Sequence, residues 1–202
     1  MSKGRKTNYI QKLTNKDIDM LKAFARTGYI TKDQLKEHLG VVDRRIINFE
    51  RDKYIEKVSY LDKSTKDSAF VYRLTQKGQS LCYNQLNIES LYRSSSPLHD
   101  ITFANHYFKI KDEVVEWITE SQWRDRMEDY LIHLKTEDHD RWAEISEMWK
   151  NELISPPDGG YVNSQGVEIA LEVITSNYGS EEIVAKETFV EILQAEYIEI
   201  RA

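Results

Sequence analysis

The chain has only one cysteine, no long hydrophobic run and no internal repeat. Because Cys82 has no second cysteine to pair with, an internal disulfide is excluded, which favours a reducing compartment. No apolar stretch approaches the roughly 20 residues that cross a bilayer. The basic start, residues 1–6, has no hydrophobic segment behind it, so we expect no signal peptide. These absences predict a cytoplasmic protein that contacts no membrane.

Charge is divided unevenly along the chain. Residues 1–96 contain 19 lysines and arginines against 11 aspartates and glutamates, a net charge of +8. Residues 97–202 contain 9 against 23, a net charge of −14, and the two parts together give the −6 of the whole chain. A basic segment is typical of a domain that meets phosphate. Length and charge therefore predict two domains, 10–90 and 97–202, joined by a polar linker at 87–96.

The basic part shows the pattern of a DNA-binding module. Capping residues and apolar spacing predict helices near 15–27, 32–39 and 42–53, with Gly40 in the turn before the third. A β-hairpin with strands 55–60 and 70–74 and another helix, to about residue 86, follow. This order matches the helix-turn-helix plan. Residues 14–86 resemble the winged helix-turn-helix superfamily, in which the sequence Leu-Thr-x-Lys-Gly, here residues 74–78, is common after the wing.

The third predicted helix carries the candidate base-contacting residues. Its outward positions are Arg44, Arg45, Asn48 and Arg51. Arg44, Asn48 and Arg51 are spaced i, i+4 and i+7, so they share one helix face. Arginine pairs bidentately with guanine and asparagine with adenine in the major groove. The pattern therefore predicts that this helix binds double-stranded DNA.

Two lysines at the tip of the predicted hairpin, Lys63 and Lys66, are placed to contact the DNA backbone. Contacts to phosphate position a protein on the duplex but carry no sequence information. The alternative is a winged helix that contacts other proteins, with Arg44 and Arg45 solvated. The positive charge of the whole segment argues against this alternative.

The acidic part has an α+β order of elements. We expect a long helix at 98–119, a strand at 130–134, a strand or turn at 153–162 and a hairpin loop at 163–166. A strong strand at 167–175, a helix at 181–193 and a last strand at 195–200 follow. The four tryptophans lie in acidic surroundings, so we place them in the core and not on a base-stacking surface. The fold class predicted for the whole chain is α+β, with a smaller α/β domain after the DNA-binding module.

A Pro-Asp pair followed by a strand that bears a glutamate resembles the core of restriction-endonuclease-like nucleases. In that family two carboxylates hold Mg²⁺, and a lysine two residues after the second acid helps to activate water. Asp158 and Glu172 match the acids, but Ile174 occupies the lysine position. Lys186 on the following helix would replace it if it reaches the acids. The resemblance implies either an Mg²⁺-dependent nuclease or an inactive relative that makes protein or DNA contacts, and we expect the second, without a cofactor.

Three short motifs, at 98–100 (Leu-His-Asp), 157–159 (Pro-Asp-Gly) and 170–173 (Ala-Leu-Glu-Val), complete the pattern. Together with the winged helix they resemble the replication-relaxation family of plasmids and conjugative elements of Gram-positive bacteria. The resemblance implies a role in replication, maintenance or mobilisation of such an element. The expected partners are double-stranded DNA, a second copy of the chain, because such modules commonly bind paired half-sites as dimers, and a relaxase or replication initiator. The alternative role is a transcriptional repressor with a C-terminal oligomerisation or effector domain.

Overall fold

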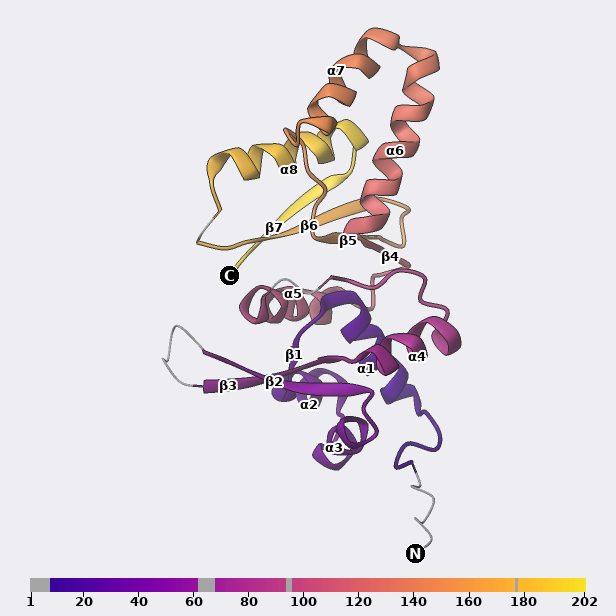
Figure 1. Ribbon diagram of the computed structural model, residues 1–202, viewed down its shortest axis with the longest axis vertical. Coiled ribbons are helices and arrows are strands. Elements are labelled where there is room, and N and C mark those ends of the chain that lie inside the picture. Colours follow the sequence, from indigo (N-terminus) through magenta and orange to yellow (C-terminus); the bar gives the residue numbers. More distant parts are fainter. Residues whose placement is uncertain (1–7, 62–67, 94–95, 177) are drawn as a thin grey trace, which may run out of the picture. The chain divides into compact units, whose positions relative to one another are not determined.

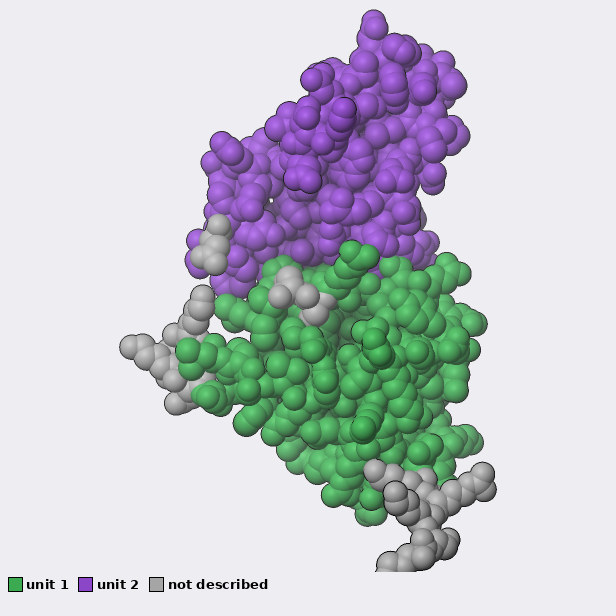
Figure 2. Space-filling model, viewed as in Figure 1, with its two compact units in different colours: residues 1–108 green, residues 109–202 purple. Residues whose placement is uncertain are grey.

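The structure is a computed structural model that describes residues 8–61, 68–93, 96–176 and 178–202. The chain divides into two compact units, residues 1–108 (unit 1) and residues 109–202 (unit 2), which Figure 2 shows in separate colours. Each unit combines helices with its own small sheet, so the fold is mixed α+β (Figure 1). The division follows Phe108, whereas the sequence analysis placed a linker at 87–96.

Unit 1 begins with three short helices and a β-hairpin. Its elements in chain order are α1 (Asn15–Thr27), β1 (Ile30–Thr31), α2 (Lys32–Leu39), α3 (Asp43–Arg51), β2 (Ile55–Leu61), β3 (Ser68–Leu74), α4 (Gln76–Leu86) and α5 (Pro97–Ile110). The three strands form an antiparallel sheet in the order β1-β3-β2. These bounds confirm the predicted helices, the hairpin and the helix that follows it.

Local sequence explains where the first helices begin and end. Thr14 and Asp17 form a capping box at the start of α1, and Thr31 and Gln34 form one at the start of α2. Each box satisfies two backbone groups that a helix leaves without intrahelical partners. Gly40 ends α2 in the left-handed conformation, at φ 60°, which a glycine adopts without strain. The turn before α3 is therefore encoded locally.

Helix α5 belongs to unit 1, although we expected it to open the second domain. The Asp100 side chain is fully buried, and its Oδ2 accepts the backbone N–H of Tyr29 at 3.1 Å. The Gln34 amide donates to the carbonyl of Ile101 at 2.9 Å. The Leu-His-Asp motif at 98–100 thus has a structural task, because it attaches α5 to the turn after α1. Elsewhere in unit 1, Cys82 is fully buried, and burial raises the pKa of its thiol to about 11.

Unit 2 is built on a four-stranded sheet. Its elements are β4 (Glu116–Thr119), α6 (Glu120–Glu137), α7 (His139–Lys150), β5 (Gly159–Val162), β6 (Glu168–Ile174), α8 (Ser180–Leu193) and β7 (Glu196–Arg201). The strand order is β4-β5-β6-β7, with only β6 and β7 parallel because α8 connects them. Helices α6, α7 and α8 lie on the same side of this sheet (Figure 1). The predicted helix 181–193 and the strands around it are confirmed.

Two predictions for the acidic part are wrong. The helix expected at 98–119 ends at Ile110, because the chain turns and then enters β4; just before β4, the backbone N–H of Val115 donates to the carbonyl of Val162 at 2.9 Å. The strand expected at 130–134 lies inside α6. Buried residues recur there at helical spacing, at Trp123, Met127 and Leu131, and they pack in the core of unit 2. The tryptophans are buried or partly buried in this unit, as expected.

Candidate functional site

One face of α3 is directed outward and carries polar and cationic side chains. Arg44 and Arg51 are exposed and Asn48 is half-buried, while Ile46 and Phe49 on the other side lie in the core. The helical period of 3.6 residues separates these two faces. The structure therefore brings three of the four predicted base-contacting residues together on one exposed surface.

Arg45 does not belong to this surface, and its predicted outward orientation is wrong. Its guanidinium donates to both carboxylate oxygens of Asp17, at 2.8 and 2.6 Å, and to the carbonyl of Lys12 at 2.8 Å. Burial alone would raise the pKa of Asp17, but hydrogen bonds from Arg45 and Thr14 outweigh it and hold the pKa below its ordinary value. Arg45 is thus a structural residue that fixes α3 against the start of α1.

The start of α3 carries an acid that would repel phosphate if it were unpaired. Asp43 forms ion pairs with Lys32 at 2.7 Å and Lys36 at 3.4 Å, both from α2. The hydrogen bond from Lys32 holds the pKa of Asp43 below its ordinary value, so the carboxylate stays ionised and paired at neutral pH. The negative charge at the helix start is therefore balanced within the unit.

The motif at residues 74–78 fixes the other end of α3. Lys77 Nζ donates to the carbonyl of Asp52 at 2.8 Å, and Thr75 Oγ1 donates to the carbonyl of Lys53 at 2.5 Å. A Cβ atom at Gly78 would lie 2.0 Å from the carbonyl oxygen of Tyr54, so only glycine fits there. The sequence Leu-Thr-x-Lys-Gly thus supplies the backbone contacts that hold the end of α3 against the start of α4.

Three predicted DNA-contacting residues remain. Lys63 and Lys66 lie outside the described residues. Arg51 lies over the ring of Tyr9, with its guanidinium carbon 5.4 Å from the ring centroid. Such a cation–π contact orients the arginine without neutralising its charge.

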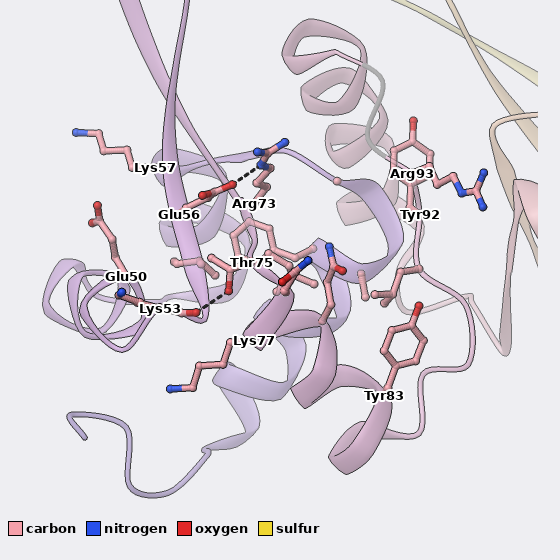
Figure 3. A pocket seen from close by; sticks show the side chains of 18 residues that line it. Glu50, Lys53, Glu56, Lys57, Arg73, Thr75, Lys77, Tyr83, Tyr92 and Arg93 are labelled. Atoms are coloured by element: carbon pink, nitrogen blue, oxygen red, sulfur yellow. Dashed lines mark hydrogen bonds and ion pairs between the residues drawn. The ribbon is translucent and has the colours of Figure 1, made fainter. Parts of the chain in front are cut away.

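A groove of about 1100 Å³ lies in unit 1 beside the end of α3 (Figure 3). Its charged lining residues are Glu50, Lys53, Glu56, Lys57, Arg73, Lys77 and Arg93. Several of these charges already have partners, because Arg73 pairs with Glu56 at 2.6 Å and Lys77 donates to a backbone carbonyl. The groove adjoins the end of α3 through Glu50 and Lys53, and we assign it no separate ligand.

In unit 2 the structure brings together all three residues of the predicted nuclease site. Lys186 Nζ lies 3.1 Å from Glu172 Oε1, and the backbone N–H of Asp158 donates to Glu172 Oε2 at 2.8 Å. Asp158 Oδ2 in turn accepts the backbone N–H of Val173 at 2.9 Å. Lys186 on α8 thus reaches Glu172, one of the two acids, which is the condition the sequence analysis set for a replacement of the missing lysine at Ile174.

Hydrogen bonds and one ion pair connect the members of this carboxylate cluster (Asp158, Glu172, Tyr178 and Lys186). Glu172 is fully buried and also accepts the hydroxyl of Tyr178 at 2.6 Å. Burial and the charge of Asp158 raise the pKa of Glu172, against the opposing influence of Lys186 and Tyr178. The pKa of Tyr178 is raised too, by burial and by Glu172. Tyr178 could not be predicted as a member of this cluster, because it precedes α8 in a segment without the periodic spacing of a helix or a strand.

No protein-family model, curated protein or solved structure matches this chain. Within the described residues, no group of three or more His, Cys, Asp or Glu side chains is arranged to hold a metal ion. In the same part of the chain, no helix is long and apolar enough to cross a membrane.

One residue of the α3 surface was missed by the sequence analysis. Ile47 is 43% exposed and lies between Arg44 and Arg51 along the helix. The signal was present in the spacing, because Ile47 is three residues after Arg44 and four before Arg51. The sequence analysis considered only the polar and cationic outward residues of this helix, so Ile47 was left out. We call Arg44, Ile47, Asn48 and Arg51 the α3 surface.

Proposed function

We propose that the chain binds double-stranded DNA, with the α3 surface in the major groove in the manner of a winged helix-turn-helix domain. The observation that carries the proposal is the α3 surface itself. It is an exposed helix face with two arginines and an asparagine, on a helix that is fixed at both ends. These are the side chains that recognise guanine and adenine edges, and the rigid attachment of the helix favours a defined docking geometry.

The rest of unit 1 supports this arrangement. The ion pairs of Asp43 with two lysines balance a negative charge that would otherwise repel phosphate. The bidentate contact between Arg45 and Asp17 fixes the rotation of α3 against α1. The net positive charge of residues 1–96 attracts the duplex from a distance. Lys63 and Lys66, which lie between β2 and β3 in the sequence, would add phosphate contacts.

The biological setting is part of the same proposal. The motifs that resemble the replication-relaxation family favour a protein of a plasmid or conjugative element that acts in replication, maintenance or mobilisation. In this setting the protein would bind DNA as a homodimer, and the acidic unit would contact a basic partner such as a relaxase or replication initiator. A transcriptional repressor is the alternative role, and the location of the bound site, at an origin or at a promoter, would separate the two.

The test begins with selection of bound sequences from a pool of random duplexes, followed by fluorescence anisotropy on the selected site. We expect Arg44→Ala and Asn48→Ala each to weaken binding by about 1–3 kcal/mol, roughly 5- to 150-fold. Arg124→Ala is the matched control, because Arg124 is an exposed helical arginine of unit 2. If all three variants bind the selected duplex with the affinity of wild type, α3 is not the recognition helix.

A second candidate function is favoured by the convergence of Asp158, Glu172 and Lys186. The two carboxylates would supply oxygen ligands for Mg²⁺, which would then activate water for phosphodiester hydrolysis. The test incubates supercoiled plasmid with the protein in EDTA, Mg²⁺ or Mn²⁺. Nicked or linear DNA that requires metal and is lost in Asp158→Ala would support a nuclease. Intact plasmid in every condition would leave DNA binding as the function.

A further inference from the structure

An aliphatic side chain stands in the middle of the polar α3 surface. Ile47 is 43% exposed, whereas the other isoleucine of this helix, Ile46, is 1% exposed. Single exposed apolar residues are common on protein surfaces. Ile47 differs from such a residue because its helical neighbours on either side, Arg44 and Arg51, are cationic and exposed. Water solvates this methyl-bearing surface in the free protein, and contact with an apolar group would remove it from water.

The spacing along α3 sets where such a contact would fall. With a rise of about 1.5 Å per residue, Arg44 and Arg51 are roughly 10.5 Å apart along the helix axis. Base pairs in B-DNA are about 3.4 Å apart, so the two arginines span about three base-pair steps when the helix follows the groove. Ile47 lies between the two arginines and directly precedes Asn48 in the helix. A contact of Ile47 with DNA would therefore fall among the base pairs that the polar side chains of α3 contact.

The major groove offers one apolar group on its base edges, the 5-methyl group of thymine. From these observations we infer that Ile47 is a specificity-determining residue that packs against a thymine methyl group between the base pairs contacted by Arg44 and Arg51. The ligand class is a duplex with a thymine inside the α3 footprint. This inference rests on the proposed function and extends it from DNA binding to the choice of a base.

The experiment removes the methyl group from the DNA and the side chain from the protein separately. Each thymine of the selected duplex is replaced in turn by deoxyuridine, which pairs in the same way but lacks the 5-methyl group. Burial of one methyl-sized group contributes about 0.8 kcal/mol, which corresponds to about fourfold in affinity. We expect wild type to lose about fourfold at one thymine. Ile47→Ala should bind the unmodified duplex less tightly and should no longer respond to deoxyuridine at that position.

Val184→Ala is the control, because Val184 is an aliphatic residue of α8 in unit 2 and is 56% exposed. It should retain the wild-type response to deoxyuridine. Two results would overturn the inference while DNA binding stands: no thymine position that responds in wild type, or the same response in Ile47→Ala. If the random pool yields no bound duplex, the proposed function and this inference fail together. Thermal melts of both variants exclude misfolding as the cause.

Discussion

Two adjacent arginines of α3 have different surroundings and therefore different expected tasks. Arg44 is exposed, and within the described residues no hydrogen bond or ion pair involves its side chain. Arg45 contacts Asp17 through two hydrogen bonds, and Asp17 is 1% exposed. Removal of one partner from such a pair leaves a buried charge without compensation. Substitution of Arg45 should therefore affect mainly the stability of the fold, and substitution of Arg44 mainly the affinity for DNA.

We expect Arg45→Ala to lower the free energy of unfolding by about 2–3 kcal/mol, because charge-assisted hydrogen bonds to Asp17 are lost. Arg44→Ala, one residue away, should change stability by less than about 0.5 kcal/mol. Urea unfolding monitored by circular dichroism measures both. A stability loss in Arg44→Ala, or none in Arg45→Ala, would contradict this division of tasks.

The same contact gives unit 1 a dependence on acid. The pKa of Asp17 lies below its unfolded value, so its contribution to stability is present above about pH 4 and is lost as the pH falls through the folded-state pKa. We expect the urea midpoint to fall between about pH 4 and pH 2. Asp17→Asn should lack this part of the decline. The midpoints of both proteins, measured over this pH range, test the prediction.

Glu172 in unit 2 should show the opposite trend. Its pKa is raised, so its carboxyl group favours the fold while protonated, and this contribution is lost as the pH rises through the folded-state pKa. Glu172→Gln retains an acceptor for the Tyr178 hydroxyl but has no charge. Unfolding of unit 2 from pH 4 to pH 8 should therefore show a loss of stability in wild type that Glu172→Gln lacks. If the stability of the two proteins changes with pH in the same way, the raised pKa of Glu172 is not the cause of the loss.

At the scale of elements, the contact between the end of α3 and the start of α4 is the most restrictive. We expect Gly78→Ala to destabilise the fold by more than about 3 kcal/mol, because its Cβ would meet the backbone oxygen of Tyr54 at 2.0 Å. Gly179→Ala is the control, since the nearest atom there is a flexible Glu182 oxygen at 4.0 Å. Thermal melts distinguish the two, and a Gly78→Ala protein with a wild-type melting temperature would contradict the structure.

The elements of unit 1 could be predicted from the sequence because their ends are marked locally. Caps at Thr14 and Thr31 and the left-handed glycine at position 40 define helix ends without reference to the rest of the fold. The helix expected at 98–119 was wrong because apolar spacing continued past Ile110, where only pairing with β5 makes the chain extended. The mainly apolar residues 130–134 suggested a strand, but Leu131 and Leu134 pack in the core of unit 2 as part of α6.

The candidate site was predictable to a similar extent. The helical period of 3.6 residues was enough to place Arg44, Asn48 and Arg51 on one face of the helix. The proximity of Lys186 to the acids was a conditional prediction, and the structure shows Lys186 beside Glu172. The orientation of Arg45 could not be predicted, because it depends on Asp17, which is 28 residues away in the chain. Long-range partners of this kind leave no periodic signal in the sequence.

At the scale of the whole molecule, the net charge of −6 conceals a basic segment. We expect DNA binding in spite of the negative net charge, with an affinity that falls steeply with salt. If roughly four phosphates are contacted, affinity should fall about 100-fold between 50 and 200 mM salt. Anisotropy titrations at several salt concentrations give the slope, which Arg124→Ala should leave unchanged. An affinity independent of salt would exclude a phosphate-based contact.

The buried thiol of unit 1 has a further consequence for how the molecule is studied. Cys82 is the only cysteine, whereas all four tryptophans, Trp117, Trp123, Trp142 and Trp149, lie in unit 2. Alkylation of a fully buried thiol requires local opening, so its rate reports the opening free energy of unit 1 alone. Indole fluorescence reports unit 2. Each half of the chain thus contains its own spectroscopic or chemical probe, and a duplex bound to unit 1 should slow alkylation by mass action without any label being introduced.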